Sequence, residues 1–120
     1  MTERFTGHWT PVILYAAAIF SVSSLQGKYV PSLFPGSDKV FHILEYMPFG
    51  FLVARAFDKT RRWGSLMTVF WITCLFVFLY GLSDEFHQIF VPGRDFSFVD
   101  LGADVIGAAA GGRLYLSWLK

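Results

Sequence analysis

The chain of 120 residues is long enough for one domain, and 54% of its residues are hydrophobic whereas 16% are charged. A soluble domain of this size has too little interior to bury so much apolar surface, so the composition predicts a membrane protein. The net charge of +1 and the lack of a basic stripe exclude nucleic acid as an expected partner.

Two charge-free stretches predict membrane-spanning helices. The first covers residues 9–26 and starts at Trp9, a residue type that anchors helices at the membrane interface. A cleavable signal peptide is the competing interpretation, because Ala16 and Ala18 imitate the small-residue pattern of a cleavage site. The second covers residues 63–83 and is the plainest transmembrane segment of the sequence. Since this later segment needs a membrane as well, we interpret the first stretch as a span.

Two further spans are predicted over residues 38–57 and 100–119, although polar residues interrupt both. The first contains His42 and Glu45 within a helix of about 28 Å, and the second carries Asp104 near its start. The predicted fold class is therefore all-α, an integral membrane bundle of four transmembrane helices that forms one domain over the whole chain. The bilayer is its expected environment.

Small residues recur every four positions in the last predicted helix, at Ala103, Gly107 and Gly111. Such a stripe lets another helix approach closely. We interpret it as a packing face within the bundle. The alternative is a docking face for a partner or a second copy, which would make the protein a homo-oligomer through Gly107 and Gly111.

Basic residues near the ends of spans favour the cytoplasm. Under the four-span prediction, one side of the membrane collects seven of the ten basic residues, namely Arg4, Arg55, Lys59, Arg61, Arg62, Arg113 and Lys120. The other side has Lys28, Lys39 and Arg94, together with seven of the nine acids: Asp38, Glu45, Asp84, Glu85, Asp95, Asp100 and Asp104. Both termini are therefore predicted to be cytoplasmic.

Ionisable and polar side chains from three predicted helices fall at one membrane depth on the extracytoplasmic side. The candidates for catalysis are His42, Glu45, Asp84, Glu85 and His87, and the candidates for binding a substrate are Lys39, Gln88, Arg94, Asp100 and Asp104. Ionisable groups at this depth are expected to face the bundle interior and to mark function. The structural alternative is that Lys39 and Arg94 only neutralise nearby acids and the network specifies helix packing.

The excess of acids predicts either protonated carboxyl groups or a bound cation. A divalent cation could be held by His42, Glu45, Asp84 and His87, a donor set that suits zinc or manganese, whereas carboxylates with water suit magnesium. Acid–base chemistry without a metal could instead pair a histidine with Glu45, while Arg94 holds an anionic group. These alternatives leave open both the cofactor and whether the protein is an enzyme.

Two segments resemble the signatures of the VanZ-like membrane proteins. The first is DKVFHILEY over residues 38–46, followed by Phe49 and Gly50; the second is SDEFHQIFVPGR over residues 83–94, followed by Asp100, Gly107 and Gly111. The resemblance runs from Asp38 to Gly112. The sequence departs from the family pattern at Asp104, where many relatives have asparagine, and at Pro48, where an aliphatic residue is usual.

This resemblance implies a multi-pass protein of the bacterial cytoplasmic membrane, and namesake members are linked to lowered sensitivity to the glycopeptide teicoplanin. It implies no reaction. Our leading hypothesis is that the polar cluster binds an anionic cell-envelope lipid or cell-wall precursor at the outer leaflet. The alternative is a non-catalytic membrane module whose polar network only orders the bundle.

Overall fold

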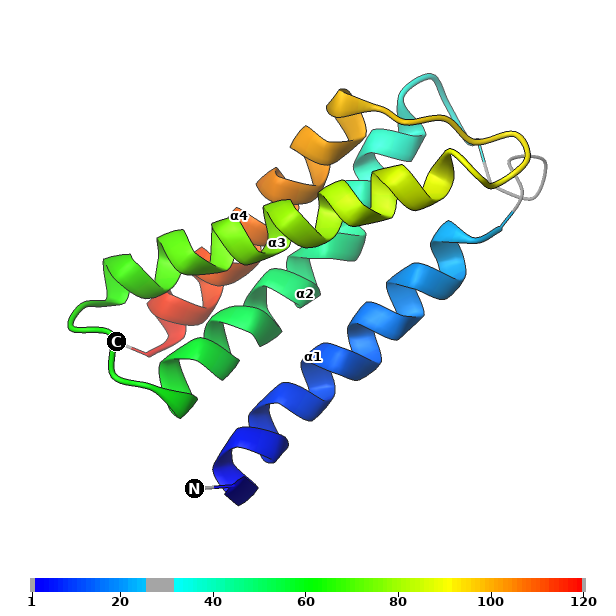
Figure 1. Ribbon diagram of the computed structural model, residues 1–120. Helices are drawn as coiled ribbons and strands as arrows, with labels where there is room; N and C mark the ends of the chain where they lie inside the picture. Colours follow the sequence, from blue (N-terminus) through cyan, green and yellow to red (C-terminus); the bar gives the residue numbers. More distant parts are fainter. Residues whose placement is uncertain (1, 26–31, 120) are drawn as a thin grey trace.

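The computed structural model describes residues 2–25 and 32–119, and this part of the chain folds into four helices. They are α1 (Thr2–Ser23), α2 (Ser37–Thr60), α3 (Leu66–Gln88) and α4 (Phe98–Trp118). Successive helices run in opposite directions and lie side by side along one long axis (Figure 1). The all-α prediction is confirmed. The first helix begins before the predicted position 9, and residue 26, its predicted end, lies outside the described residues.

The helix starts have local causes in the sequence. The Ser65 hydroxyl accepts a hydrogen bond from the Thr68 amide at 3.2 Å and caps α3, and the Ser97 hydroxyl accepts one from the Asp100 amide at 3.1 Å and caps α4. Gly36 precedes α2 with a φ of 84°, a left-handed conformation that residues with a Cβ rarely adopt. Each cap fixes the register of the helix behind it.

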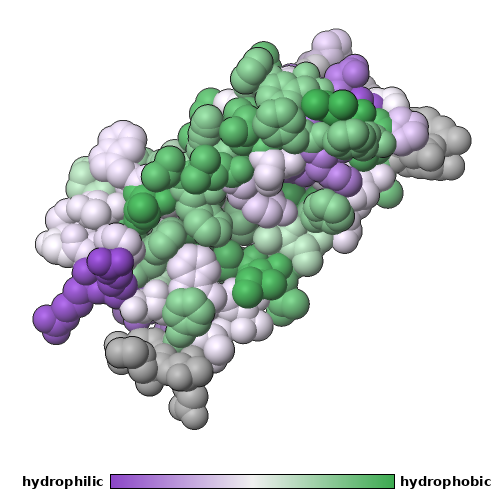
Figure 2. Space-filling view, in the orientation of Figure 1, coloured by the Kyte–Doolittle hydropathy of each residue, from purple (hydrophilic) through white to green (hydrophobic). Residues whose placement is uncertain are grey.

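In the described part of the chain, three helical segments are long and apolar enough to cross a membrane: Phe5–Ser23, Ser37–Thr60 and Leu66–Gln88. The 21 residues of α4 are not among them, because this helix carries Asp100, Asp104 and Arg113. Large apolar side chains are exposed on the outer faces, including Ile13, Leu14, Trp71, Leu75, Leu79, Ile106 and Leu114. Hydrophobic residues cover much of the visible surface between the ends of the bundle (Figure 2). The protein is therefore a multi-pass membrane protein in contact with lipid.

The stripe of small residues in α4 packs on α2. A Cβ at Gly107 would lie 2.3 Å from the carbonyl oxygen of Ile43, and a Cβ at Gly111 would lie 1.8 Å from that of Met47. From the other side, Gly50 of α2 lies against the backbone of α4. The predicted packing face is confirmed. The alternative, docking of a second copy on Gly107 and Gly111, would need a face that α2 already covers at backbone distance.

The two ends of the bundle differ in charge. The start of α1, the α2–α3 connection and the end of α4 lie together at one end (Figure 1), and the basic residues in and beside these segments are Arg4, Arg55, Lys59, Arg61, Arg62 and Arg113. The other end joins the end of α1, the start of α2 and the α3–α4 connection. The predicted contribution of Lys28 to this second end, and of Lys120 to the first, lies outside the described residues.

Candidate functional site

A cavity of about 730 Å³ lies at the second end of the bundle, between α1, α2, α3, the α3–α4 connection and the start of α4. Polar and ionisable side chains line much of it: Ser23, Ser37, Asp38, Lys39, His42, Glu45, Asp84, Gln88, Arg94, Asp95, Ser97 and Asp100. Seven of the ten candidates from the sequence are among them. The structure thus brings most of the predicted cluster to one cavity.

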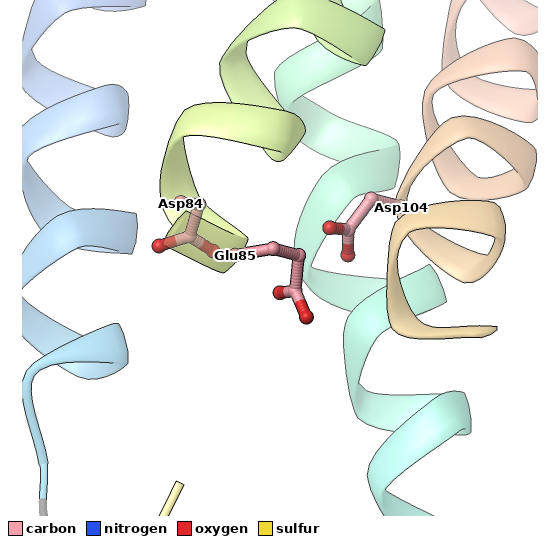
Figure 3. A group of neighbouring side chains, drawn as sticks. All are labelled: Asp84, Glu85 and Asp104. Carbon is pink, nitrogen blue, oxygen red and sulfur yellow. The ribbon is translucent and has the colours of Figure 1, made fainter. Parts of the chain in front are cut away.

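Three carboxylates lie beneath this cavity and are called the carboxylate triad: Asp84 and Glu85 of α3 and Asp104 of α4. One oxygen atom of each lies within 4.8 Å of the corresponding atom of the other two. Figure 3 shows the Asp104 side chain extending from α4 toward Glu85. Asp84 is 5% exposed, and Glu85 and Asp104 are 0% exposed. The triad is therefore buried between the two helices, and only Asp84 also lines the cavity.

One oxygen of each triad carboxylate accepts a hydrogen bond. The Tyr46 hydroxyl donates to Asp84 Oδ2 at 3.2 Å, and the Ser97 amide donates to Glu85 Oε1 at 2.9 Å. His42 Nδ1 lies 2.6 Å from Asp104 Oδ1 and donates to it when this carboxyl group is ionised, because a carboxylate only accepts. These contacts fix the side-chain rotamers of the triad.

The second oxygen of each triad carboxylate is buried without a hydrogen-bond partner among the described residues. These atoms are Asp84 Oδ1, Glu85 Oε2 and Asp104 Oδ2. Buried polar atoms are nearly always paired in native proteins, and an ionised carboxylate oxygen without a partner is especially unfavourable. A carboxylate triad with three such atoms indicates a positively charged occupant or bound protons.

A second set of charges links α2 to α4 above the triad. Lys39 Nζ lies 2.5 Å from Asp38 Oδ2 and 2.6 Å from Asp100 Oδ1, and His42 Nε2 lies 3.7 Å from Asp100 Oδ2. Lys39 therefore already neutralises two acids, as the structural alternative predicted. His42 stands between Asp100 and Asp104 and connects this charged set to the triad.

Arg94 lines the cavity but pairs with backbone rather than with an acid. Its Nε donates to the Leu25 carbonyl at 3.1 Å and its Nη2 donates to the Val22 carbonyl at 3.4 Å. No ion pair of Arg94 is present within residues 2–25 and 32–119. Because a guanidinium has five N–H donors, several remain for another group. The prediction that Arg94 only neutralises nearby acids does not describe this arrangement.

Three further candidates lie outside the triad: Glu45, His87 and Gln88. Glu45 lines the cavity, and its backbone carbonyl accepts a hydrogen bond from Tyr15. His87 Nε2 lies 2.9 Å from Ser24 Oγ, and its ring is stacked on Phe20 of α1. Gln88 Nε2 donates to Ser23 Oγ at 3.1 Å. His87 and Gln88 therefore attach α3 to α1.

The metal set expected from the sequence is not the one that the fold gathers. That expectation combined His42, Glu45, Asp84 and His87, whereas the clustered ligand atoms of the described residues belong to the triad. His87 contacts α1, and His42 hydrogen-bonds Asp104 instead of standing free. Asp84 is the only residue common to both sets.

Sequence reasoning missed two supports of the site, Tyr46 and Ser97. Tyr46 lies four residues after His42, a spacing that places both on one face of a helix and could have drawn attention to it. Ser97 lies three residues before Asp100 and so had the spacing of a helix cap. Its amide contact with Glu85 depends on how the α3–α4 connection folds back, which local spacing does not reveal.

Comparison with known proteins places the chain in one family. No curated protein and no solved structure matches it. A family match covers residues 4–119, which includes all four helices apart from the first residues of α1 and contains both signature segments. The chain therefore belongs to the VanZ/LLP1 family and is a membrane protein of that family with a buried network of acids and a histidine.

Proposed function

We propose that the cavity binds the anionic headgroup of a cell-envelope lipid or cell-wall precursor. The observation that carries this proposal is Arg94, which lines the cavity with an unpaired positive charge in the described part of the chain. Two backbone carbonyls hold its guanidinium in place. A planar cation held in this way recognises phosphate and carboxylate groups with two parallel hydrogen bonds.

The size and position of the cavity support a headgroup as the ligand. Its volume of about 730 Å³ falls within the range of small-molecule sites, about 300–1,000 Å³. It lies at one end of helices whose outer faces are apolar, so the acyl or prenyl chain of a bound lipid could stay in the bilayer. The carboxylates of Glu45 and Asp95 supply acceptors for the hydroxyl groups of a headgroup.

The proposed topology places this cavity outside the cytoplasm. We infer that α4 is the fourth span, because its acids Asp100 and Asp104 are buried while Ile106 and Leu114 face outward. The basic end of the bundle then faces the cytoplasm together with both termini. The site would face the outer leaflet of a bacterial cytoplasmic membrane, where wall precursors are exposed.

Native mass spectrometry of the protein in phosphatidylcholine nanodiscs tests headgroup binding. A polyprenyl diphosphate and phosphatidylglycerol serve as anionic probes, and phosphatidylcholine is the uncharged reference. In the Arg94→Gln variant the amide can still donate to an α1 carbonyl, but the charge is lost. We expect affinity for the preferred anionic probe to fall about 10- to 100-fold, the usual effect of losing a charged hydrogen bond.

Arg113→Gln is the matched control, because it removes an exposed positive charge at the opposite end of the bundle. The affinity of the Arg113→Gln variant for the anionic probe should equal that of the unchanged protein. Equal binding of anionic and uncharged lipids, or equal loss in both variants, would contradict the proposal. Either outcome would favour the alternative, a non-catalytic module in which the polar network only orders the helices.

The most specific form of this proposal links the site to glycopeptide resistance. If the site handles a wall precursor, expression of the chain in a susceptible bacterium should raise the inhibitory concentration of teicoplanin, and Arg94→Gln should abolish the increase at equal protein level. An unchanged inhibitory concentration would separate this member from its namesakes and would leave headgroup binding to be judged by mass spectrometry.

A further inference from the structure

We propose that the carboxylate triad binds one divalent cation through oxygen ligands. Asp84, Glu85 and Asp104 present clustered oxygen atoms from two helices, and each residue also has a buried oxygen without a partner in the described part of the chain. The inference concerns the carboxylate triad beneath the cavity and does not depend on which headgroup the cavity binds.

The spacing of the ligand atoms fits a hard divalent cation. Around an octahedral Mg²⁺ with ligands at about 2.1 Å, neighbouring oxygens lie about 3 Å apart and opposite oxygens about 4 Å apart. Around Ca²⁺ with ligands at about 2.4 Å, these separations grow to about 3.4 Å and about 5 Å. The three triad atoms lie within 4.8 Å of one another, so one ion could contact all three.

The orientation of Asp104 supports a shared occupant. A Cβ placed on Gly81 of α3 would lie 3.3 Å from Asp104 Oδ2, so this unpartnered oxygen is directed at the helix that carries the rest of the triad. Asp104 Oδ1 is held separately by His42. The lack of a side chain at Gly81 leaves room for the carboxylate to approach α3.

The negative charge of the triad favours a cation as its occupant over water alone. The triad has three carboxylates, and the nearest basic partner among its hydrogen bonds is His42 on Asp104. Ionised carboxylates that share a buried space repel one another, and a divalent ion removes both this repulsion and the lack of partners. Carboxylate ligands without thiolate or free imidazole select Mg²⁺, Mn²⁺ or Ca²⁺ rather than zinc or copper.

The ion would be reached from the cavity. Asp84 belongs to both the triad and the cavity lining, whereas Glu85 and Asp104 lie behind it. Magnesium sites in proteins commonly combine one or two carboxylates with waters and the phosphate of a ligand. A cation on the triad would therefore offer its open side to the same space that Arg94 faces.

Binding of Mn²⁺ to the full chain in phosphatidylcholine nanodiscs tests this site without any anionic ligand. The electron paramagnetic resonance signal of free Mn²⁺ gives the stoichiometry, which we expect to be one ion per chain, displaceable by Mg²⁺ or Ca²⁺. Glu85→Gln and Asp104→Asn should each weaken binding more than about 100-fold, beyond the 10- to 100-fold effect of groups that only orient a ligand. Asp58→Asn, at the opposite end, is the control and should bind as the unchanged protein does.

A second readout separates the triad from a histidine-containing site. Electron spin-echo modulation of bound Mn²⁺ should show no directly coordinated nitrogen. A strong ¹⁴N coupling, or a loss of Mn²⁺ binding in Glu45→Gln as large as in Glu85→Gln, would overturn the triad assignment. If a triad variant does not fold, the unchanged protein decides: the absence of Mn²⁺ binding to folded protein would overturn the proposal.

The Arg94→Gln protein distinguishes this inference from the proposed function. If it binds Mn²⁺ normally but no longer binds the anionic lipid probe, both proposals are supported. If the unchanged protein binds the lipid probe and no Mn²⁺, the cation site is wrong while headgroup binding stands.

Discussion

The two ends of this bundle differ in where their charged groups lie. At the cavity end, acids of α3 and α4 are buried, and Asp100 and Asp104 of α4 contact Lys39 and His42 of α2. At the opposite end, charges stay near the surface, where Arg61 lies 4.6 Å from the centre of the Trp63 ring and the Tyr115 hydroxyl donates to Asp58 at 2.7 Å. Surface charges need little compensation, whereas buried charges at membrane depth require specific partners. This difference is the reason why we propose the functional site at the cavity end.

The largest expected effect comes from the helix contact that supports both ends. Gly111→Leu should lower the free energy of unfolding by more than about 4 kcal/mol, because the added Cβ would lie 1.8 Å from the Met47 carbonyl oxygen. Thermal unfolding in detergent, followed by circular dichroism, measures this loss. Gly102→Ala is the control in the same helix, since no atom lies within 4 Å of its added Cβ, and it should not destabilise.

Breaking one polar contact at each end tests the comparison directly. His42→Ala leaves Asp104 buried without its partner and should destabilise by about 3–5 kcal/mol. Tyr115→Phe removes a neutral hydroxyl from half-buried Asp58 and should destabilise by about 1 kcal/mol. Chemical denaturation in mixed micelles compares the two variants. Equal losses would mean that the buried network at the cavity end has no special energetic role.

The two serine caps give a smaller and more local comparison. Ser65→Ala and Ser97→Ala should each destabilise their helix by about 1 kcal/mol. Only Ser97→Ala should also change the protection of the Ser97 amide, because this amide donates to Glu85. Hydrogen exchange measured by mass spectrometry would detect the difference. Equal protection around both caps would indicate that Glu85 does not order the α3–α4 connection.

The smallest expected effect is at the basic end. Arg61→Ala removes an exposed cation from the face of the half-buried Trp63 ring and should change stability by only about 0.5–1 kcal/mol. Thermal unfolding at low and high salt measures the change. A loss as large as that of His42→Ala would show that the basic end is not simply a solvated surface.

The sequence predicted most of the fold because long apolar stretches between charged residues form membrane-spanning helices in a bilayer. It also predicted that polar side chains gather at one end of the bundle, because the rise per residue gives the depth of each residue along a helix, and seven of the ten candidates line the cavity there. The sequence predicted a span over residues 100–119 although Asp100 and Asp104 interrupt its hydrophobicity, and α4 is not among the three segments that are long and apolar enough to cross a membrane. Only the fold shows that both acids are buried.

The finer arrangement of the site depends on how each helix is rotated about its axis. His87 and Asp84 are three residues apart on α3, yet His87 contacts α1 and Asp84 joins the triad. Helical spacing predicts which residues share a face but not which neighbour that face meets. The close approach of Asp104 to α3 depends on Gly81, a glycine that has no special spacing in the sequence.

The contacts of Arg94 with α1 also have an electrostatic consequence. The carbonyl end of a helix carries a partial negative charge and has oxygens without intrahelical donors. By bonding the carbonyls of Val22 and Leu25, the guanidinium places a full positive charge on the negative pole of the α1 macrodipole. The same cation thus bonds the last turn of α1 while other N–H donors remain for the anionic group that we propose as its ligand. The position of α1 therefore helps to set the position of the guanidinium at the cavity.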